Sequence, residues 1–237
     1  MPFTFSHPAV VLPFAKAFKR SLSFTALVIG SMTPDFEYFI RMRMSSPFSH
    51  TWEGLVWFDI PLGFVLVLVY EFFVKDKLID RLPTASNRRL SRYRGYRMNY
   101  TAGYLIAILI SLALGAASHI AWDGFTHPQG MFIHQFPILK HIVRIHDYPL
   151  YVFTILQHGS TLLGALFIWI CYLFLPKGEL TKVKSTAGYW LQILLVTAVV
   201  LAVRFAFGLN YHQYGDVIVS FITGALIGLL VASFIND

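Results

Sequence analysis

Histidines and aspartates in the first 127 residues have the types and spacing of metal ligands. His119 and Asp123 are four residues apart, so a helix places both side chains on one face, where they can chelate an ion. Four more candidates have the same ligand types: His7, Asp35, His50 and His127. Imidazole and carboxylate ligands suit zinc first, and also manganese or iron. The single cysteine lies inside an apolar run, so a metal must use nitrogen and oxygen ligands.

Such a cluster can carry out hydrolysis. Several carboxylates can hold more than one ion, clamp the attacking and leaving oxygens of a phosphoester, and lower the pKa of a bound water towards neutrality. A secondary set of ligands comes later in the chain: His158, His212 and Asp216. Glu37 and Glu53 are candidate proton acceptors, and Arg204 is a candidate for holding a substrate phosphate.

The composition indicates an integral membrane protein and excludes an ordinary soluble domain. Of 237 residues, 56% are hydrophobic and only 13% are charged. Stretches of about twenty apolar residues predict spanning helices, at 54–74, 101–122, 155–175, 188–207 and 215–235. We therefore expect an all-α polytopic helix bundle of about five spans, forming a single domain over residues 1–237.

The N-terminal segment, residues 1–53, is expected to contribute site residues to the bundle of residues 54–237. Residues 8–30 are apolar, but Lys16, Lys19 and Arg20 fall near their middle, which favours an interfacial or capping helix over a span. Thr33 and Pro34 predict the start of a new helix, with Asp35 in its first turn. Nothing in the first residues has the pattern of a cleaved signal peptide, so His7 is expected to persist.

Charge predicts the orientation. Residues 75–99 and 176–187 are rich in Lys and Arg, which places both segments in the cytoplasm. Alternating spans then put residues 1–53, 123–154 and 208–214 outside, so the six ligands gather at one outer end. The basic residues before position 54 argue weakly for the inverse orientation. Within 75–99, arginines alternate with tyrosines; lipid headgroups suit this juxtamembrane segment better than nucleic acid, and no nucleic-acid partner is expected.

Less specific interpretations stay open for individual residues. His119 and Asp123 could hydrogen-bond each other to hide their polarity, and Asp35 could simply favour the start of a helix. Asp59 and Arg204 lie near the ends of spans, where polar groups are expected to reach towards water. A non-catalytic lipid-binding or assembly protein with a structural metal or hydrogen-bond cluster is the rival function. A transporter is a weaker one, because three spans are apolar at their centres.

Four segments carry a family resemblance: MPFTFSHPAVVLP, LVIGSMTPDFEYF, FSHTWEG and SHIAWDGFTHPQG. They resemble a bacterial membrane family of unknown function that begins with a Ser-His-Pro signature. That family is similar to YdjM-type inner-membrane proteins described as metal-dependent hydrolases and, distantly, to zinc-dependent phospholipase C.

The phospholipase likeness implies the order of the ligands. An early His falls on His7, an Asp on Asp35 and the next His on His50. A His-x-x-x-Asp pair falls on His119 and Asp123, and a further His on His127. The final His-x-x-x-Glu of that pattern has no faithful counterpart: His158 lacks the carboxylate, and His212 with Asp216 comes late and substitutes Asp.

Together these patterns predict a metal-dependent hydrolase embedded in the bacterial cytoplasmic membrane, with its site on the outer side. Zinc is the expected cofactor, with one or more ions. The expected substrate is a phosphoester or a phospholipid-like amphiphile, and membrane lipids are the expected partners. The sequence does not determine the oligomeric state.

Overall fold

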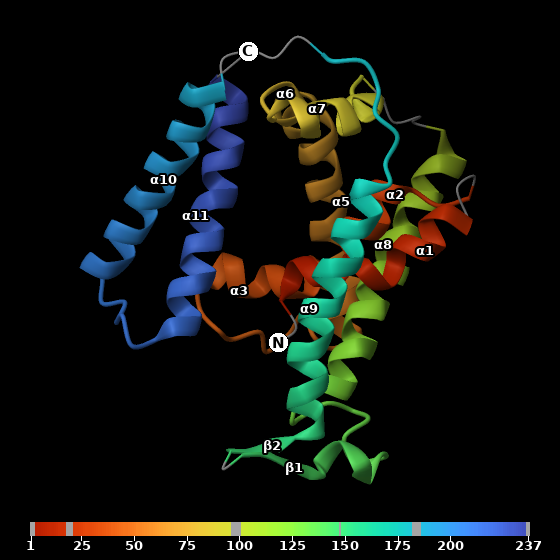
Figure 1. Cartoon of the computed structure of the whole chain (residues 1–237), viewed down its shortest axis with the longest axis vertical. Coiled ribbons are helices and arrows are strands. Elements are labelled where there is room, and N and C mark those ends of the chain that lie inside the picture. Colours follow the sequence, from red (N-terminus) through yellow and green to blue (C-terminus); the bar gives the residue numbers. More distant parts are fainter. Residues whose placement is uncertain (1–2, 18–20, 96–100, 147, 182–185, 236–237) are drawn as a thin grey trace. The chain divides into compact units, whose positions relative to one another are not determined.

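The chain folds as an all-α polytopic membrane bundle, as predicted. The computed structural model describes residues 3–17, 21–95, 101–146, 148–181 and 186–235 (Figure 1). Among these, five helices are long and apolar enough to cross a membrane. They are Trp52–Asp80, α8 (Ala102–Thr126), α9 (Val152–Leu173), α10 (Thr186–Ala206) and α11 (Tyr214–Ile235). Each matches a predicted span, so the protein is an integral membrane protein.

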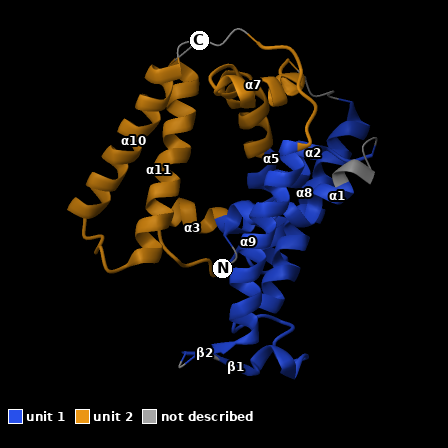
Figure 2. Ribbon diagram, viewed as in Figure 1, with its two compact units in different colours: residues 1–35, 48–64, 100–173 blue, residues 36–47, 65–99, 174–237 orange. Residues whose placement is uncertain are grey.

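Two compact units divide the chain (Figure 2). The first contains residues 1–35, 48–64 and 100–173, and the second contains residues 36–47, 65–99 and 174–237. All six predicted ligands belong to the first unit. Segments far apart in sequence must therefore fold together before those side chains can meet.

The first span is longer than predicted. It consists of α4 (Trp52–Gly54), the π-helical η3 (Leu55–Asp59), α5 (Ile60–Val69), the π-helical η4 (Tyr70–Val74) and α6 (Lys75–Asp80). The start of the predicted basic loop is thus helical, because Lys75 is buried and forms an ion pair with Glu71 one turn earlier. The helix α7 (Thr84–Leu90) and the 3-10 turn η5 (Ser91–Tyr93) follow, and residues 96–99 of that loop lie outside the described residues.

The predicted N-terminal helix is in fact two helices. The 3-10 turn η1 (Thr4–Ser6) precedes α1 (Pro8–Ala17), and α2 (Phe24–Gly30) precedes the 3-10 turn η2 (Thr33–Asp35). Lys19 and Arg20 lie outside the described residues, as do the basic residues at 182–185. The hydroxyl of Ser23 accepts a hydrogen bond from the amide of Ala26 and so caps α2.

Glycines allow α2 and α8 to pack backbone to backbone. A Cβ added at Gly30 would lie 2.5 Å from the carbonyl oxygen of Leu112, and one added at Gly115 would lie 2.5 Å from that of Leu27. Small residues permit such close helix crossings in membranes. The contact places the C-terminal end of α2 beside the last turns of α8, where His119 lies.

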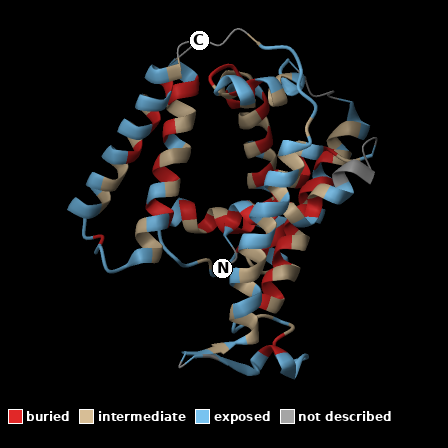
Figure 3. Ribbon diagram, in the orientation of Figure 1, coloured by how far each residue is buried: buried red, intermediate tan, exposed pale blue. Residues whose placement is uncertain are grey.

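The connection from α8 to α9 contains a hairpin that the sequence analysis does not predict. After the 3-10 turn η6 (Pro137–Lys140), the strands β1 (Ile142–Ile145) and β2 (Tyr148–Tyr151) pair antiparallel, with Ile142 opposite Tyr151. The helix α9 follows directly. All of its residues are described and none is buried, whereas α8 is buried along one side (Figure 3).

In the second unit, α3 (Phe36–Arg41) packs on α11, and α10 packs against α11. The hydroxyl of Thr223 donates to the carbonyl of Phe39, 2.8 Å away. Gly228 lies against the backbone of Ile193, so the two C-terminal spans approach closely.

Candidate metal centre

The structure brings all six predicted ligands together in the first unit. His7 directly follows η1, Asp35 ends η2, and His50 lies in the turn before α4. The other three come from α8 and the residue that follows it: His119, Asp123 and His127. His7, Asp35, His119 and Asp123 are buried, while His50 and His127 are half-buried.

Four ligand atoms form a ring of alternating nitrogen and oxygen. His50 Nε2 lies 3.4 Å from Asp35 Oδ1 and 3.5 Å from Asp123 Oδ2. His119 Nε2 lies 3.6 Å and 3.5 Å from the same two oxygens. These separations exceed those of N–H···O hydrogen bonds. Ligands at the corners of a tetrahedron around zinc, each about 2.1 Å from the ion, are about 3.4 Å apart, which the ring matches.

Asp123 links this ring to two more histidines. Its Oδ1 lies 3.7 Å from His7 Nε2, and its Oδ2 lies 3.6 Å from His127 Nδ1. The His7 ring stacks on the His119 ring, with centroids 3.6 Å apart and planes inclined by 12°. Asp123 Oδ1 thus faces His7, whereas Oδ2 faces His50, His119 and His127.

A backbone carbonyl fixes the tautomer of His119. Its Nδ1 lies 2.8 Å from the carbonyl oxygen of Ser31. A carbonyl can only accept, so Nδ1 carries the proton in the neutral ring and Nε2 presents a lone pair to the carboxylates. The close packing of α2 on α8 supplies this carbonyl, because Ser31 directly follows α2.

His50 is oriented in a similar way. The hydroxyl of Ser49 donates to the carbonyl of Pro34 at 2.7 Å, so its oxygen can accept the proton of His50 Nδ1, 3.1 Å away. This leaves the lone pair of His50 Nε2 to face the carboxylates. Asp35 is held by Thr4, whose hydroxyl donates to Oδ2 at 2.6 Å, so Oδ1 is left to face the two imidazoles.

Buried polar atoms at the centre make no hydrogen bond to any described residue. They include His7 Nε2, His119 Nε2, His127 Nε2, Asp35 Oδ1 and Asp123 Oδ1. Unsatisfied buried polar atoms are costly and rare. Here nitrogen lone pairs face carboxylate oxygens, and only a cation or a proton between them makes that arrangement favourable. The donor set therefore fits a divalent metal.

Burial keeps two of the histidines neutral, the form that binds metal. Burial and the neighbouring His119 lower the pKa of His7 to about 3. Burial also lowers the pKa of His127. Neither ring therefore needs to lose a proton near neutral pH before it can coordinate an ion.

Asp35, whose carboxylate belongs to the four-atom ring and lies outside the spanning helices, is held ionised. Burial alone would raise the pKa of Asp35, but the facing imidazoles of His119 and His50 hold it below its ordinary value. Burial alone would lower the pKa of His50, but the facing carboxylates of Asp123 and Asp35 raise it. A proton on His50 Nε2 would therefore compete with a metal ion for this nitrogen.

The secondary ligands are divided between the two units. His158 belongs to the first unit but is exposed on α9. His212 and Asp216 belong to the second unit, where the Tyr211 ring packs on His212, and Asp216 accepts the amide hydrogen of Met44 at 2.8 Å.

The candidate proton acceptors and the candidate phosphate-binding arginine each have different neighbours. Glu37 lies in the second unit, where it accepts a hydrogen bond from Arg41 at 2.8 Å. Arg204, in the same unit, donates to the carbonyl of Met42 at 2.9 Å. Glu53 lies in the first unit, exposed on α4 and three residues after His50.

The structure corrects two local predictions and confirms a third. Thr33 is not a helix N-cap, because its hydroxyl donates to the carbonyl of Ile29. Asp35 lies in a 3-10 turn and not in the first turn of an α-helix. Asp59 does not reach towards water but is 1% exposed. The end of α8 before His127 is confirmed, since α8 stops at Thr126 and His127 has extended backbone angles.

Sequence reasoning missed the residues that orient the ligands. Ser49 and Thr4 act through their hydroxyls, and Ser31 acts through its carbonyl. A hydroxyl next to a histidine is a weak sequence signal, and a carbonyl has none, because every residue carries one.

Comparison with curated proteins and with solved structures gives no match, so the likeness to YdjM-type proteins and phospholipase C is not shown by them. A family model does match, and it covers residues 1–234. The chain therefore belongs to the family described as a domain of unknown function, DUF4184.

Proposed function

We propose that the protein is a membrane-embedded, metal-dependent hydrolase of a phosphoester or a phospholipid-like amphiphile. One observation carries this proposal: the Nε2 atoms of His50 and His119, each with its Nδ1 proton directed elsewhere, face two carboxylate oxygens at 3.4 to 3.6 Å. That geometry suits a divalent ion, and nitrogen and oxygen ligands of this kind suit zinc.

The six ligands can be divided between two ions. Asp35, His50 and His119 would hold one ion together with Asp123 Oδ2. His7 would hold the second with Asp123 as the bridging carboxylate, because Asp123 Oδ1 lies 3.7 Å from His7 Nε2. His127 would join it through Nε2, because its Nδ1 lies 3.2 Å from the backbone carbonyl of Asp123. The first ion would then have four protein ligands and the second three, so the second ion keeps a position for water and substrate.

The chemistry would be attack of a metal-activated water on phosphorus. His50 and His127 are half-buried, so they form the side of the centre that water and substrate can reach. Glu53 is the candidate proton acceptor, because it is exposed and lies three residues after His50. Glu37 already pairs with Arg41, so we do not assign it that role.

The resemblance described above supports this assignment. The ligand order from His7 to His127 follows zinc-dependent phospholipase C, and the segments around it resemble YdjM-type hydrolases. The missing His-x-x-x-Glu pair favours a centre with fewer ions than that phospholipase. We further propose a bacterial cytoplasmic membrane location, with basic segments inside and the metal centre outside.

A structural metal is the second candidate, in a lipid-binding or assembly protein. Asp35, His50, His119 and Asp123 are together a complete tetrahedral set for a single ion. A site closed in this way is typical of structural zinc. A proton on His50 could replace the ion, giving a hydrogen-bond cluster instead.

Metal stoichiometry separates these candidates. We expect protein purified in detergent without chelators to contain two zinc ions per chain, measured by elemental mass spectrometry, and to hydrolyse bis(p-nitrophenyl) phosphate. His119→Ala and Asp123→Ala should lose the metal and the activity, whereas His158→Ala, at an exposed histidine of α9, should keep both.

Other results would decide against the hydrolase. One tightly held ion without turnover would establish the structural metal. Protein that is folded but contains no metal above background, even after incubation with zinc, would contradict both metal proposals and leave the hydrogen-bond cluster.

A further inference from the structure

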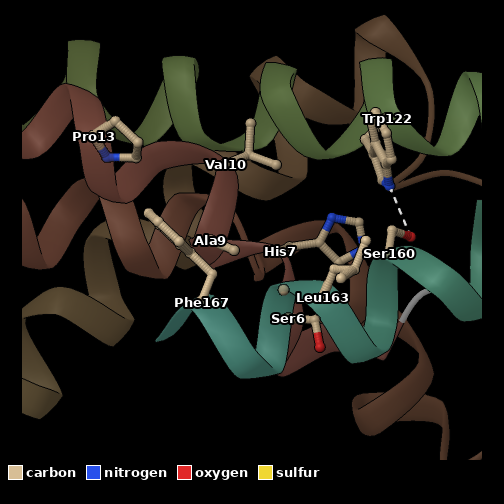
Figure 4. A pocket seen from close by; sticks show the side chains of 10 residues that line it. Ser6, His7, Ala9, Val10, Pro13, Trp122, Ser160, Leu163 and Phe167 are labelled. Carbon is tan, nitrogen blue, oxygen red and sulfur yellow. Dashed lines mark hydrogen bonds between the residues drawn. The ribbon is translucent and has the colours of Figure 1, made fainter. Parts of the chain in front are cut away.

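An apolar groove lies directly beside the candidate metal centre. It has a volume of about 430 Å³ and lies in the first unit between α1 and α9, with Trp122 of α8 at one side (Figure 4). This volume is within the range of small-molecule sites, roughly 300 to 1,000 Å³. His7 is its only ionisable lining residue, and Ala9, Val10, Pro13, Leu163 and Phe167 supply most of its wall.

The groove has a polar end and an apolar end. Trp122 and Ser160 lie at one end and Pro13 and Phe167 at the other, with His7 between them (Figure 4). The indole N–H of Trp122 donates to Ser160 Oγ at 3.2 Å. His7 belongs both to the groove wall and to the metal centre, since its Nε2 lies 3.7 Å from Asp123 Oδ1.

The direction of the groove follows the spans. The polar end faces the connection between α8 and α9, because Trp122 lies four residues before the end of α8 and Ser160 lies eight residues after the start of α9. From Ser160 to Phe167, α9 rises about 10 Å through the middle of the span. No residue of α9 is buried, so the α9 side of the groove is open.

The wall also limits what can occupy the groove. Apart from the metal centre, its polar side chains already have partners: the hydroxyl of Ser6 donates to the carbonyl of Thr161, and Ser160 accepts from Trp122. A peptide in the groove would bring backbone groups that find no partner among apolar side chains. A hydrocarbon chain brings none, and its burial is favourable.

We propose that this groove holds the hydrocarbon chain of the substrate and directs its phosphate to the metal centre. The inference rests on the proposed function. It narrows the substrate to membrane amphiphiles that carry a hydrocarbon chain next to the phosphate that is attacked. A water-soluble phosphoester would reach the same ions but would leave the groove without a ligand.

Photolabelling tests the groove. The probe is dodecyl phosphate with a diazirine near the end of its chain, added to protein in phosphatidylcholine nanodiscs. We expect labelling at Val10 and Phe167 to exceed that at Leu194, which faces outward on α10 and is 62% exposed. Leu163→Trp should fill the groove and lower this excess about ten-fold, equivalent to excluding roughly two methylene groups.

Leu162→Trp is the matched control. Leu162 and Leu163 are adjacent on α9 and are 73% and 68% exposed, but only Leu163 lines the groove. Labelling of Leu162→Trp should equal that of the wild type. Equal labelling of groove and outward positions in the wild type, or the same response in both variants, would overturn the inference.

Zinc content, measured on the same samples, separates the two proposals. If all three proteins contain zinc but labelling shows no preference, the groove inference fails and the hydrolase stands. If the wild type contains no zinc but prefers the groove, the hydrolase fails, and the groove is then a lipid site without chemistry.

Discussion

At the level of residues, the candidate metal centre depends on proton positions as much as on the side chains that would bind the ion. His119 and His50 can present Nε2 to an ion only because a carbonyl and a hydroxyl take up the protons of their Nδ1 atoms. If either ring flipped or changed tautomer, it would place an N–H group where a lone pair is needed. The residues that accept those protons are therefore positioning residues for the centre.

Ser49→Ala tests this role. Loss of the hydroxyl removes the acceptor for His50 Nδ1, so we expect zinc affinity to fall by about 10 to 100-fold. The affinity is measured by competition with a chromophoric chelator. His50 itself remains, so the variant should still bind zinc at high concentration.

Ser118→Ala is the control for that measurement. Ser118 is next to His119, but its hydroxyl donates only to the carbonyl of Gly115 within the same helix. Its zinc affinity should match the wild type. Identical affinities for the Ser49 and Ser118 variants would show that the hydroxyl of Ser49 does not orient the ligand.

At the level of elements, the α2 and α8 crossing determines where the ligands are. The backbones meet at Gly30 and Gly115, and this contact brings Ser31 within reach of His119. The crossing is therefore linked directly to the metal centre, because any separation of the two helices moves the carbonyl that fixes the His119 tautomer.

Gly115→Ala should disturb this crossing. The new Cβ would lie 2.5 Å from the carbonyl oxygen of Leu27, so the helices must separate. Overpacking of this kind costs about 1 to 3 kcal/mol, and we expect a lower melting temperature together with weaker zinc binding.

Gly103→Ala, on the same helix, is the matched control. Beyond its own helix, no atom of the described residues lies within 4 Å of the position of its Cβ, so the substitution should leave zinc binding unchanged and leave the melting temperature equal or slightly higher. A Gly115→Ala protein as stable as Gly103→Ala would mean that the two helices do not approach as closely as described.

The elements themselves could largely be predicted from sequence. The apolar runs predicted the spans, and Pro128 correctly predicted that α8 ends before His127. The proximity of the six ligands followed from the spans and their alternation, but their geometry did not. The hydroxyl of Thr33, for example, bonds back to Ile29 instead of capping a new helix, and no local pattern distinguishes these two uses.

Other departures have physical causes outside the local sequence. The first span continues through Lys75 because Glu71 pairs with it one turn away, so a charge that normally ends a span is neutralised. The hairpin of β1 and β2 is short and mostly exposed, and strands of four residues give little periodic signal.

At the level of the whole molecule, the six ligands come from residues 7 to 127 and meet only after several segments have packed. Placing such a centre near one end of the spans gives it contact with water and with lipid at once. The proposed role of the groove beside His7 requires that position, because a hydrocarbon chain would have to enter the groove from the bilayer. Which membrane surface carries the centre is therefore part of the proposed function.

Cysteine labelling in intact cells tests the orientation. With Cys171 replaced by Ala, single cysteines are placed at Tyr148, which is 75% exposed on β2, and at Ala85, which is exposed on α7. Only α8 crosses the membrane between these two positions, so they must lie on opposite sides. The positive-inside rule places Ala85 in the cytoplasm.

We therefore expect a membrane-impermeant maleimide to label Tyr148→Cys in intact cells and Ala85→Cys only after permeabilisation. The opposite pattern would invert the molecule and place the metal centre at the cytoplasmic surface, where the substrate chain would have to come from the inner leaflet. Labelling of both positions in intact cells would show that α8 does not span the membrane. Because Ala85 and Tyr148 flank one helix, the experiment depends on neither the metal nor the groove.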